Sequence, residues 1–199
     1  AGIAYFKDTG KISIRKTVGK VKDLLAICDD DNNSTCGIGH TRWATHGGVT
    51  NANAHPHKVG NVALIHNGII ENYADIKKNL ISKGVEFKSE TDTEVLVQLI
   101  EYIQVKKELD LLTAVQVALR QVIGAYAIAI LDKRNPNQII AARKQSPLVV
   151  GIGENGEFYL GSDASPIIEY TDKVVYLEDG NIAVMRLGEE LQVVNIQNV

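Results

Sequence analysis

The alternation of apolar and polar residues predicts a β-hairpin at the start of the chain. Residues 2–6 and 12–18 alternate, and the polar turn 7–11 separates them. Apolar residues then recur at helical spacing, which predicts a short helix over 19–28.

The middle of the chain changes from strands to helices. Strands are expected over 36–44 and 61–67, and between them the segment 45–60 is rich in Gly, Asn, Pro and His without periodicity. A loop of this length in a compact domain is usually functional. Amphipathic helices are expected over 72–83, 91–107 and 109–122, the second opened by the capping-box pattern Thr91-x-x-Glu94.

The last part of the chain is a series of short β segments. Turn signals at 135–137, 154–156 and 178–180 help to separate expected strands over 126–131, 138–143, 148–152, 157–160, 174–177, 181–185 and 191–196. Because the helices are grouped rather than alternating with strands, we expect an α+β domain. Two antiparallel sheets should face each other with helices on their outer faces, and no linker divides residues 1–199.

Composition and charge exclude several classes of protein. The 199 residues carry 21 Lys and Arg against 24 Asp and Glu, a net charge of −3, so the chain lacks the basic surface that binds nucleic acid. No apolar run is long enough for a membrane span. With two cysteines and no secretion signal, the chain is expected to be cytoplasmic. The expected partner is a small molecule or another protein.

All five histidines lie between residues 40 and 66. Neutral imidazoles in His55-Pro56-His57 are able to bind zinc, and a histidine-rich metal protein is one alternative. The cysteine pair, acidic triad or helical His-x-x-x-His spacing of a zinc site is missing, however. We therefore expect neither a metal nor another cofactor, and ordinary core or loop roles are the alternative for each histidine.

Three further positions suggest an amino-acid site. The planar fork of Arg42 suits a carboxylate, although a structural ion pair is an alternative. Asn67-Gly68 follows a strand directly, where a side-chain amide and a backbone N–H form either an oxyanion hole or a plain turn. Asp92 opens a helix, where the helix dipole favours it with or without a ligand. Its carboxylate would pair with the α-ammonium of an amino acid bound by Arg42.

Four motifs in order carry a family resemblance. The motifs are Gly39-His40-Thr41-Arg42-Trp43-Ala44-Thr45-His46-Gly47, Asn53-Ala54-His55-Pro56-His57, His66-Asn67-Gly68-Ile69-Ile70-Glu71-Asn72 and Ser89-Glu90-Thr91-Asp92-Thr93-Glu94. Together they resemble the glutaminase domain of glutamine–fructose-6-phosphate aminotransferase (isomerizing), and the similarity covers essentially the whole chain.

The resemblance implies a four-layer αββα N-terminal-nucleophile fold that hydrolyses L-glutamine to glutamate and ammonia. In the complete, homodimeric enzyme the ammonia passes to a C-terminal sugar isomerase domain, which makes glucosamine 6-phosphate for amino-sugar synthesis. Carried over by position, Arg42 binds the substrate carboxylate and Asp92 its ammonium. Thr45 and His46 belong to a closing loop, and Trp43 helps to gate that loop. Asn67 and Gly68 form the oxyanion hole.

The sequence departs from the family at its start. Family members begin with a cysteine whose thiol attacks the carboxamide and whose α-amino group is the base, whereas Ala1-Gly2-Ile3-Ala4 resembles a later segment. About thirty residues, judged from typical strand and helix lengths, are expected before Ala1, including this nucleophile. The chain alone is therefore expected to be inactive, since the internal Cys28 and Cys36 have no free α-amine. An inactive glutamine-binding module and an amidophosphoribosyltransferase-like amidotransferase are the alternatives.

Overall fold

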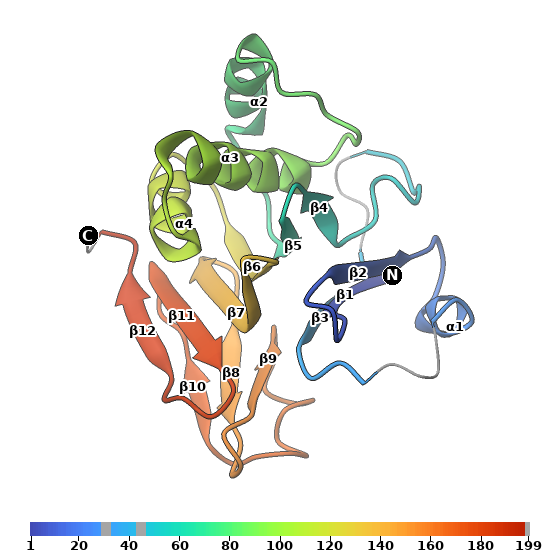
Figure 1. Cartoon of the computed structure of the whole chain (residues 1–199), viewed down its shortest axis with the longest axis vertical. Coiled ribbons are helices and arrows are strands. Elements are labelled where there is room, and N and C mark those ends of the chain that lie inside the picture. Colours follow the sequence, from blue (N-terminus) through green and yellow to red (C-terminus); the bar gives the residue numbers. More distant parts are fainter. Residues whose placement is uncertain (29–32, 43–46, 198–199) are drawn as a thin grey trace.

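A six-stranded antiparallel sheet forms the centre of the computed structural model, which describes residues 1–28, 33–42 and 47–197 (Figure 1). Its middle strand β6 is buried along its whole length. The strand order across the sheet is β12 (Gln192–Asn195), β11 (Asn181–Arg186), β7 (Asn135–Lys144), β6 (Tyr126–Asp132), β5 (Val62–Asn67) and β4 (His57–Val59).

Two smaller antiparallel sheets pack on one face of this sheet. The first has the order β2 (Ile12–Lys16), β1 (Gly2–Phe6), β3 (Gly37–His40), and the second has the order β10 (Val174–Tyr176), β8 (Val149–Ile152), β9 (Phe158–Gly161). Successive side chains of a strand point to opposite faces. Ala127 and Ala129 of β6 accordingly pack with the small sheets, whereas Ile128 and Ile130 pack with the helices.

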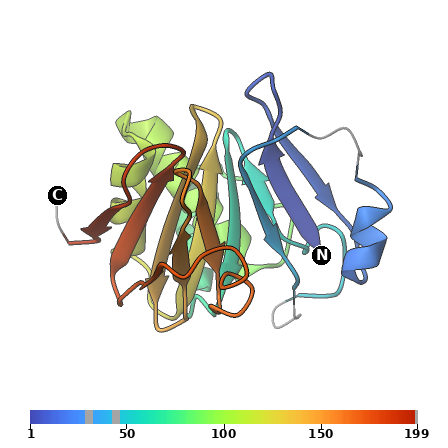
Figure 2. The ribbon, with the colours of Figure 1, turned by 90° about the horizontal axis from the view of Figure 1, so that it is seen from below.

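Three helices cover the other face of the large sheet: α2 (Tyr73–Ser82), α3 (Asp92–Lys107) and α4 (Leu111–Leu119). In Figure 2 they lie behind the strands. The start of α3 is fixed by Thr91, whose Oγ1 accepts the Glu94 N–H at 3.2 Å. The Glu94 carboxylate accepts the Lys88 and Ser89 N–H groups instead of returning to Thr91, so only half of the predicted capping box forms.

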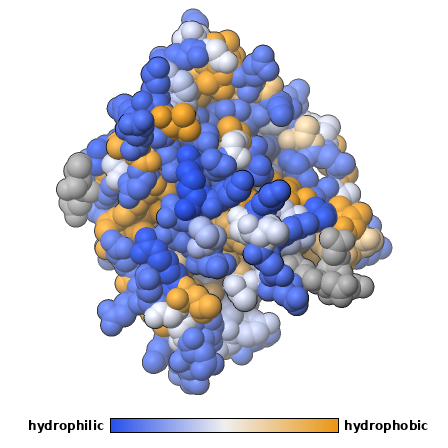
Figure 3. All heavy atoms as spheres, viewed as in Figure 1, coloured by the Kyte–Doolittle hydropathy of each residue, from blue (hydrophilic) through white to orange (hydrophobic). Residues whose placement is uncertain are grey.

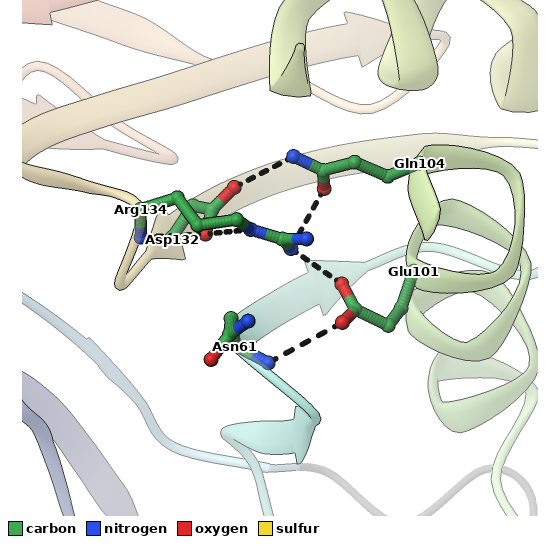
Figure 4. A network of polar contacts seen from close by, with 5 residues as sticks. All are labelled: Asn61, Glu101, Gln104, Asp132 and Arg134. Carbon is green, nitrogen blue, oxygen red and sulfur yellow. Dashed lines mark hydrogen bonds and ion pairs between the residues drawn. The ribbon is translucent and has the colours of Figure 1, made fainter. Parts of the chain in front are cut away.

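A polar network ties α3 to the β6–β7 turn (Figure 4). Asp132, 1% exposed, accepts hydrogen bonds from Gln104 and Arg134, each at 2.9 Å. Arg134 also forms an ion pair with Glu101 at 2.6 Å. Each buried polar group here has a protein partner, as stability requires. The network lies at the start of β5, and the opposite end of that strand is left for the candidate site.

The surface on the side of Figure 1 is largely hydrophilic with scattered hydrophobic residues (Figure 3). Over the described surface as a whole, exposed large hydrophobic residues include Val21 and Leu25 of the short helix α1 (Val21–Leu25), which are 50% and 66% exposed. In the part of the chain that the structure describes, no helix is both long and apolar enough to cross a membrane.

The α+β class with antiparallel sheets is confirmed. The described residues form three sheets rather than the two expected, because the layer opposite the large sheet is divided between β2-β1-β3 and β10-β8-β9. Several boundaries also differ from the sequence prediction. Strand β4 lies inside the predicted loop 45–60, and three residues are too few to show alternation. Strand β7 starts at Asn135, so the turn lies at residues 133–134 rather than at 135–137. Pro136 fits in the strand because the pairing of β7 with β6 shifts register near it. Helices α1 and α4 are shorter than predicted, and β3 ends at His40.

Candidate functional site

A cavity of about 170 Å³ lies where β5 ends and α3 begins. It brings together four of the residues singled out from the sequence, Arg42, Asn67, Gly68 and Asp92. The other three, Trp43, Thr45 and His46, lie outside the described residues. The remaining lining residues are His40, Thr41, His55, His66, Thr91 and Thr93.

Arg42 follows β3 by two residues, so it lies in a loop rather than in the strand that the sequence predicted. Its Nη1 donates to the Gly48 carbonyl at 3.0 Å and its Nη2 to the Gly47 carbonyl at 3.5 Å. The same loop is held by Asn53, whose Nδ2 donates to the Gly48 carbonyl at 2.9 Å. These contacts with backbone carbonyls hold the guanidinium at the cavity wall.

Asp92 is the first residue of α3 and is 5% exposed. Its Oδ2 accepts the Ile70 N–H at 2.8 Å. Among the described residues, no hydrogen bond is formed by Oδ1. Asp92 therefore stabilises the segment after Asn67-Gly68 with one oxygen, a role that the sequence did not predict, and has a second oxygen for a ligand.

Asn67 and Gly68 end β5 at the cavity wall. Asn67 Oδ1 lies 2.7 Å from His40 Nε2. Gly68 has φ +114°, and a Cβ there would overlap the Ala125 carbonyl, so only glycine fits. Neither the Asn67 Nδ2 nor the Gly68 N–H has a hydrogen-bond partner among the described residues. Two adjacent donors are thus available at one cavity wall, as in an oxyanion hole.

Two of the histidines near the cavity contact threonines at the start of α3. His57 Nε2 lies 3.0 Å from Thr91 Oγ1, and His55 Nε2 lies 3.3 Å from Thr93 Oγ1. Burial, reinforced by Lys16 and Arg42, lowers the pKa of His57 to about 3, and burial also lowers the pKa of His55. Both rings are therefore neutral at pH 7. Within the described ranges, no group of three His, Cys, Asp or Glu residues is arranged for a metal ion.

A second cavity of about 330 Å³ adjoins the first, and we call it the edge groove. Strand β3 with Thr41 lines one wall (residues 37–41), and strand β9 with Ser162 lines another (residues 158–162). In the described structure, β3 and β9 are each an edge strand of their small sheet. The groove shares His40, Thr41, His66 and Asn67 with the first cavity. A strand-lined groove therefore leads to the Asn67 donors.

Neither cysteine lines these two cavities. Cys28 follows α1 instead of lying on it, and Cys36 precedes β3. Burial raises the pKa of the Cys36 thiol to about 11, which disfavours the reactive thiolate. Among the described residues, the first cavity thus brings together a guanidinium, a carboxylate and two N–H donors, but no thiol.

The sequence analysis did not identify the contacts of His40 and Thr93 in the site. His40 comes from β3 and Thr93 from α3, and they meet β5 only in the folded chain. The histidine cluster between residues 40 and 66 and the motifs that contain His40 and Thr93 were signals that these residues matter, but neither signal indicated their contacts.

Comparisons with known proteins place this geometry in a family. The model of the glutamine amidotransferase domain matches residues 27–190. The glutamine–fructose-6-phosphate aminotransferase (isomerizing) of Bacteroides thetaiotaomicron is 62% identical over 100% of this chain and 33% of its own length. That of Chlorobaculum tepidum is 48% identical with the same coverage. The chain thus spans about a third of these relatives.

Solved structures share the fold. The glutamine phosphoribosylpyrophosphate amidotransferase of B. subtilis superposes with a TM-score of 0.82 at 24% identity, covering 100% of this chain and 43% of that one. An allosteric regulatory enzyme of purine biosynthesis gives a TM-score of 0.79 at 25% identity with the same coverage. The N-terminal-nucleophile amidotransferase fold expected from the motifs is confirmed. From the family match and the folded site together, the chain belongs to the glutamine amidotransferase domain family.

Proposed function

We propose that residues 1–199 form the glutaminase domain of an isomerizing glutamine–fructose-6-phosphate aminotransferase, which hydrolyses L-glutamine to glutamate and ammonia. The observation that carries this proposal is the shared cavity. Arg42, Asp92 and the donor pair Asn67-Gly68 come from three separate parts of the sequence and line it together.

The two charged residues suit the α-carbon end of glutamine. The Arg42 guanidinium binds the α-carboxylate through paired charge-assisted hydrogen bonds. The second oxygen of Asp92 binds the α-ammonium, while the first stays on the Ile70 N–H. A zwitterion clamp of this kind selects an α-amino acid, and the resemblance adds Trp43, Thr45 and His46 as the loop that closes over its side chain.

The donor pair suits the carboxamide end. When a thiolate attacks the carboxamide carbon, the carbonyl oxygen becomes an oxyanion, and the Asn67 Nδ2 and Gly68 N–H stabilise it. The C–N bond then breaks, and ammonia leaves after taking a proton. Water attacks the thioester in the same way, which releases glutamate and restores the thiol.

The thiol in this proposal comes from an N-terminal cysteine outside these 199 residues. Two observations support this origin. Cys28 and Cys36 line neither cavity, and the edge groove is lined by the edge strands β3 and β9 and by Asn67. An extended segment added between β3 and β9 would pair with both edges, as in β-augmentation. Its end would place the cysteine beside the oxyanion donors, with its α-amino group as base.

The resemblance supports a proposal for the complete protein. We propose that its ammonia passes to a C-terminal sugar isomerase domain that forms glucosamine 6-phosphate, and that the complete protein is a cytoplasmic homodimer. The identity of 62% to an isomerizing aminotransferase, against 24% to the phosphoribosylpyrophosphate amidotransferase, favours this over the purine-pathway activity.

The test uses what we call the restored chain: these 199 residues preceded by the strand-helix segment that begins Cys-Gly-Ile in the family. Asn67→Ala removes one oxyanion donor, and such losses typically lower kcat by about 10²–10³-fold. KM for glutamine should change little. Asn79→Ala, on the exposed side of α2, is the matched control. If kcat is the same in Asn67→Ala and the control, Asn67 is only a turn residue.

A further inference from the structure

The Asn67 carboxamide works as an oxyanion donor only in one of its two orientations. Its χ2 rotation is roughly two-fold, so the oxygen and the NH₂ group exchange places readily in an unconstrained side chain. With the oxygen turned toward the cavity, an acceptor would face the developing oxyanion and repel it. Some neighbouring group must therefore select the orientation.

His40 is in contact with the oxygen. Its Nε2 lies 2.7 Å from Asn67 Oδ1. A carboxamide oxygen only accepts hydrogen bonds, so Nε2 carries the proton and donates it. With the oxygen held toward β3 in this way, Nδ2 is left without a partner among the described residues and borders the cavity.

His40 stacks on His55, and a chain of hydrogen bonds fixes His55 in turn. The two ring centroids are 4.1 Å apart, and the ring planes lie within 15° of each other. His55 Nδ1 accepts the His66 N–H at 3.3 Å. Because burial keeps His55 neutral, its proton lies on Nε2 and is donated to Thr93 Oγ1 at 3.3 Å.

The chain ends on the backbone beside Gly68. Thr93, having accepted from His55, donates its own proton to His66 Nδ1 at 3.0 Å. His66 then carries its proton on Nε2, which donates to the Ala125 carbonyl at 3.3 Å. Each donor meets one acceptor, so the whole chain has a single proton arrangement. The same Ala125 carbonyl limits position 68 to glycine.

We propose that His40 is a positioning residue, which holds Asn67 Oδ1 so that Nδ2 faces the oxyanion. His55, Thr93 and His66 keep the His40 ring in place. The inference rests on the proposed function, because it gives His40 a role through the Asn67 donor. His40 Nδ1 is buried without a hydrogen bond within the described part of the chain, so stacking and the Asn67 contact define the ring's orientation.

Two variants of the restored chain separate the hydrogen bond from the ring. His40→Phe keeps an aromatic ring to stack on His55 and removes the donor. His40→Gln removes the ring and keeps an N–H donor near the position of Nε2. We expect His40→Phe to lower kcat about 10-fold or more and to leave KM for glutamine unchanged. The upper limit is the decrease of about 10²–10³-fold that is typical when one oxyanion donor is lost. His40→Gln should recover most of kcat.

A double-mutant cycle tests whether His40 acts through Asn67. If it does, His40→Phe combined with Asn67→Ala is no slower than Asn67→Ala alone. Losses that multiply would overturn the positioning role. So would a normal kcat in His40→Phe while Asn67→Ala is slow, an outcome that leaves the proposed function intact. A normal kcat in Asn67→Ala alone would overturn the oxyanion role of Asn67 and, with it, the positioning role of His40. The proposed function itself fails only if the restored chain releases no ammonia from L-glutamine.

A second measurement does not depend on activity or on the folding of variants. The ¹⁵N chemical shifts of the His40 ring in this unmodified chain report which nitrogen is protonated. We expect the proton on Nε2. A proton on Nδ1 alone would mean that His40 does not donate to Asn67, which overturns the proposal.

Discussion

Replacement of Asp92 tests the structural and the binding role of its carboxylate separately. Asp92→Ala removes the acceptor of the Ile70 N–H, and Ile70 is fully buried. A buried donor left without a partner costs about 1–3 kcal/mol, and loss of the negative charge at the start of α3 adds about 0.3–1 kcal/mol. For a chain of this size each kcal/mol shifts Tm by about 2–4 °C, so Tm should fall by roughly 3–15 °C.

Asp92→Asn retains an oxygen that accepts the Ile70 N–H and loses only the charge. Its Tm should therefore stay close to that of the wild type, and the exposed Asp75→Asn in the first turn of α2 is the matched control. Glutamine binding should differ sharply, because removing one partner of a buried charge pair costs about 2–5 kcal/mol. Calorimetric titration of the restored chain should show Kd raised about 30-fold or more.

The two assays together refute or support this reasoning. Wild-type affinity for glutamine in Asp92→Asn would show that Asp92 does not bind the ammonium. An unchanged Tm in Asp92→Ala would show that the Ile70 contact contributes nothing to stability. A lower Tm together with a weaker affinity for glutamine in Asp92→Asn would mean that the charge of Asp92 itself stabilises the fold.

Three further predictions concern other parts of the site. Arg42→Lys in the restored chain should raise KM for glutamine, because the ammonium of lysine does not reproduce the bidentate fork of arginine. Steady-state kinetics measure this, with Arg120→Lys as the control; equal KM values for the two variants would contradict the prediction. The pKa of His57 is about 3 in the folded chain against 6.5 unfolded, so the unfolded chain binds more protons between these values. The free energy of unfolding should therefore fall as pH falls from about 6.5 toward 3, by about 1.4 kcal/mol per unit for each such histidine, and urea titrations of His57→Gln should show a flatter slope. Gly68→Ala should lower Tm more than Gly84→Ala, because both glycines have positive φ but only the first has no room for a Cβ; equal shifts would refute the overlap with Ala125.

Local patterns predicted the elements well where they were long and periodic. The helix over 91–107 matches α3 nearly residue for residue, because the Thr91 cap and a buried apolar face specify it together. The three-residue strand β4 was missed, since its pairing with β5 is a tertiary contact with no period of its own.

The sequence predicted those residues of the candidate site whose chemistry follows from their residue type. Arg42, Asn67 and Asp92 were identified from their types and from the motifs around them, and the structure places them at one cavity. Their supporting contacts were not predictable. The bond from Ile70 to Asp92 and the contact of His40 with Asn67 join residues 22 and 27 positions apart, and only the packing of β3, β5 and α3 creates them.

Ammonia release from L-glutamine, measured on this chain and on the restored chain side by side, tests the central claim most directly. The account predicts no release above background from this chain. The restored chain should release ammonia and lose that activity when its N-terminal cysteine is changed to serine. Release by this chain alone, abolished by alkylation of Cys28 or Cys36, would contradict the account, because the nucleophile would then lie within the 199 residues.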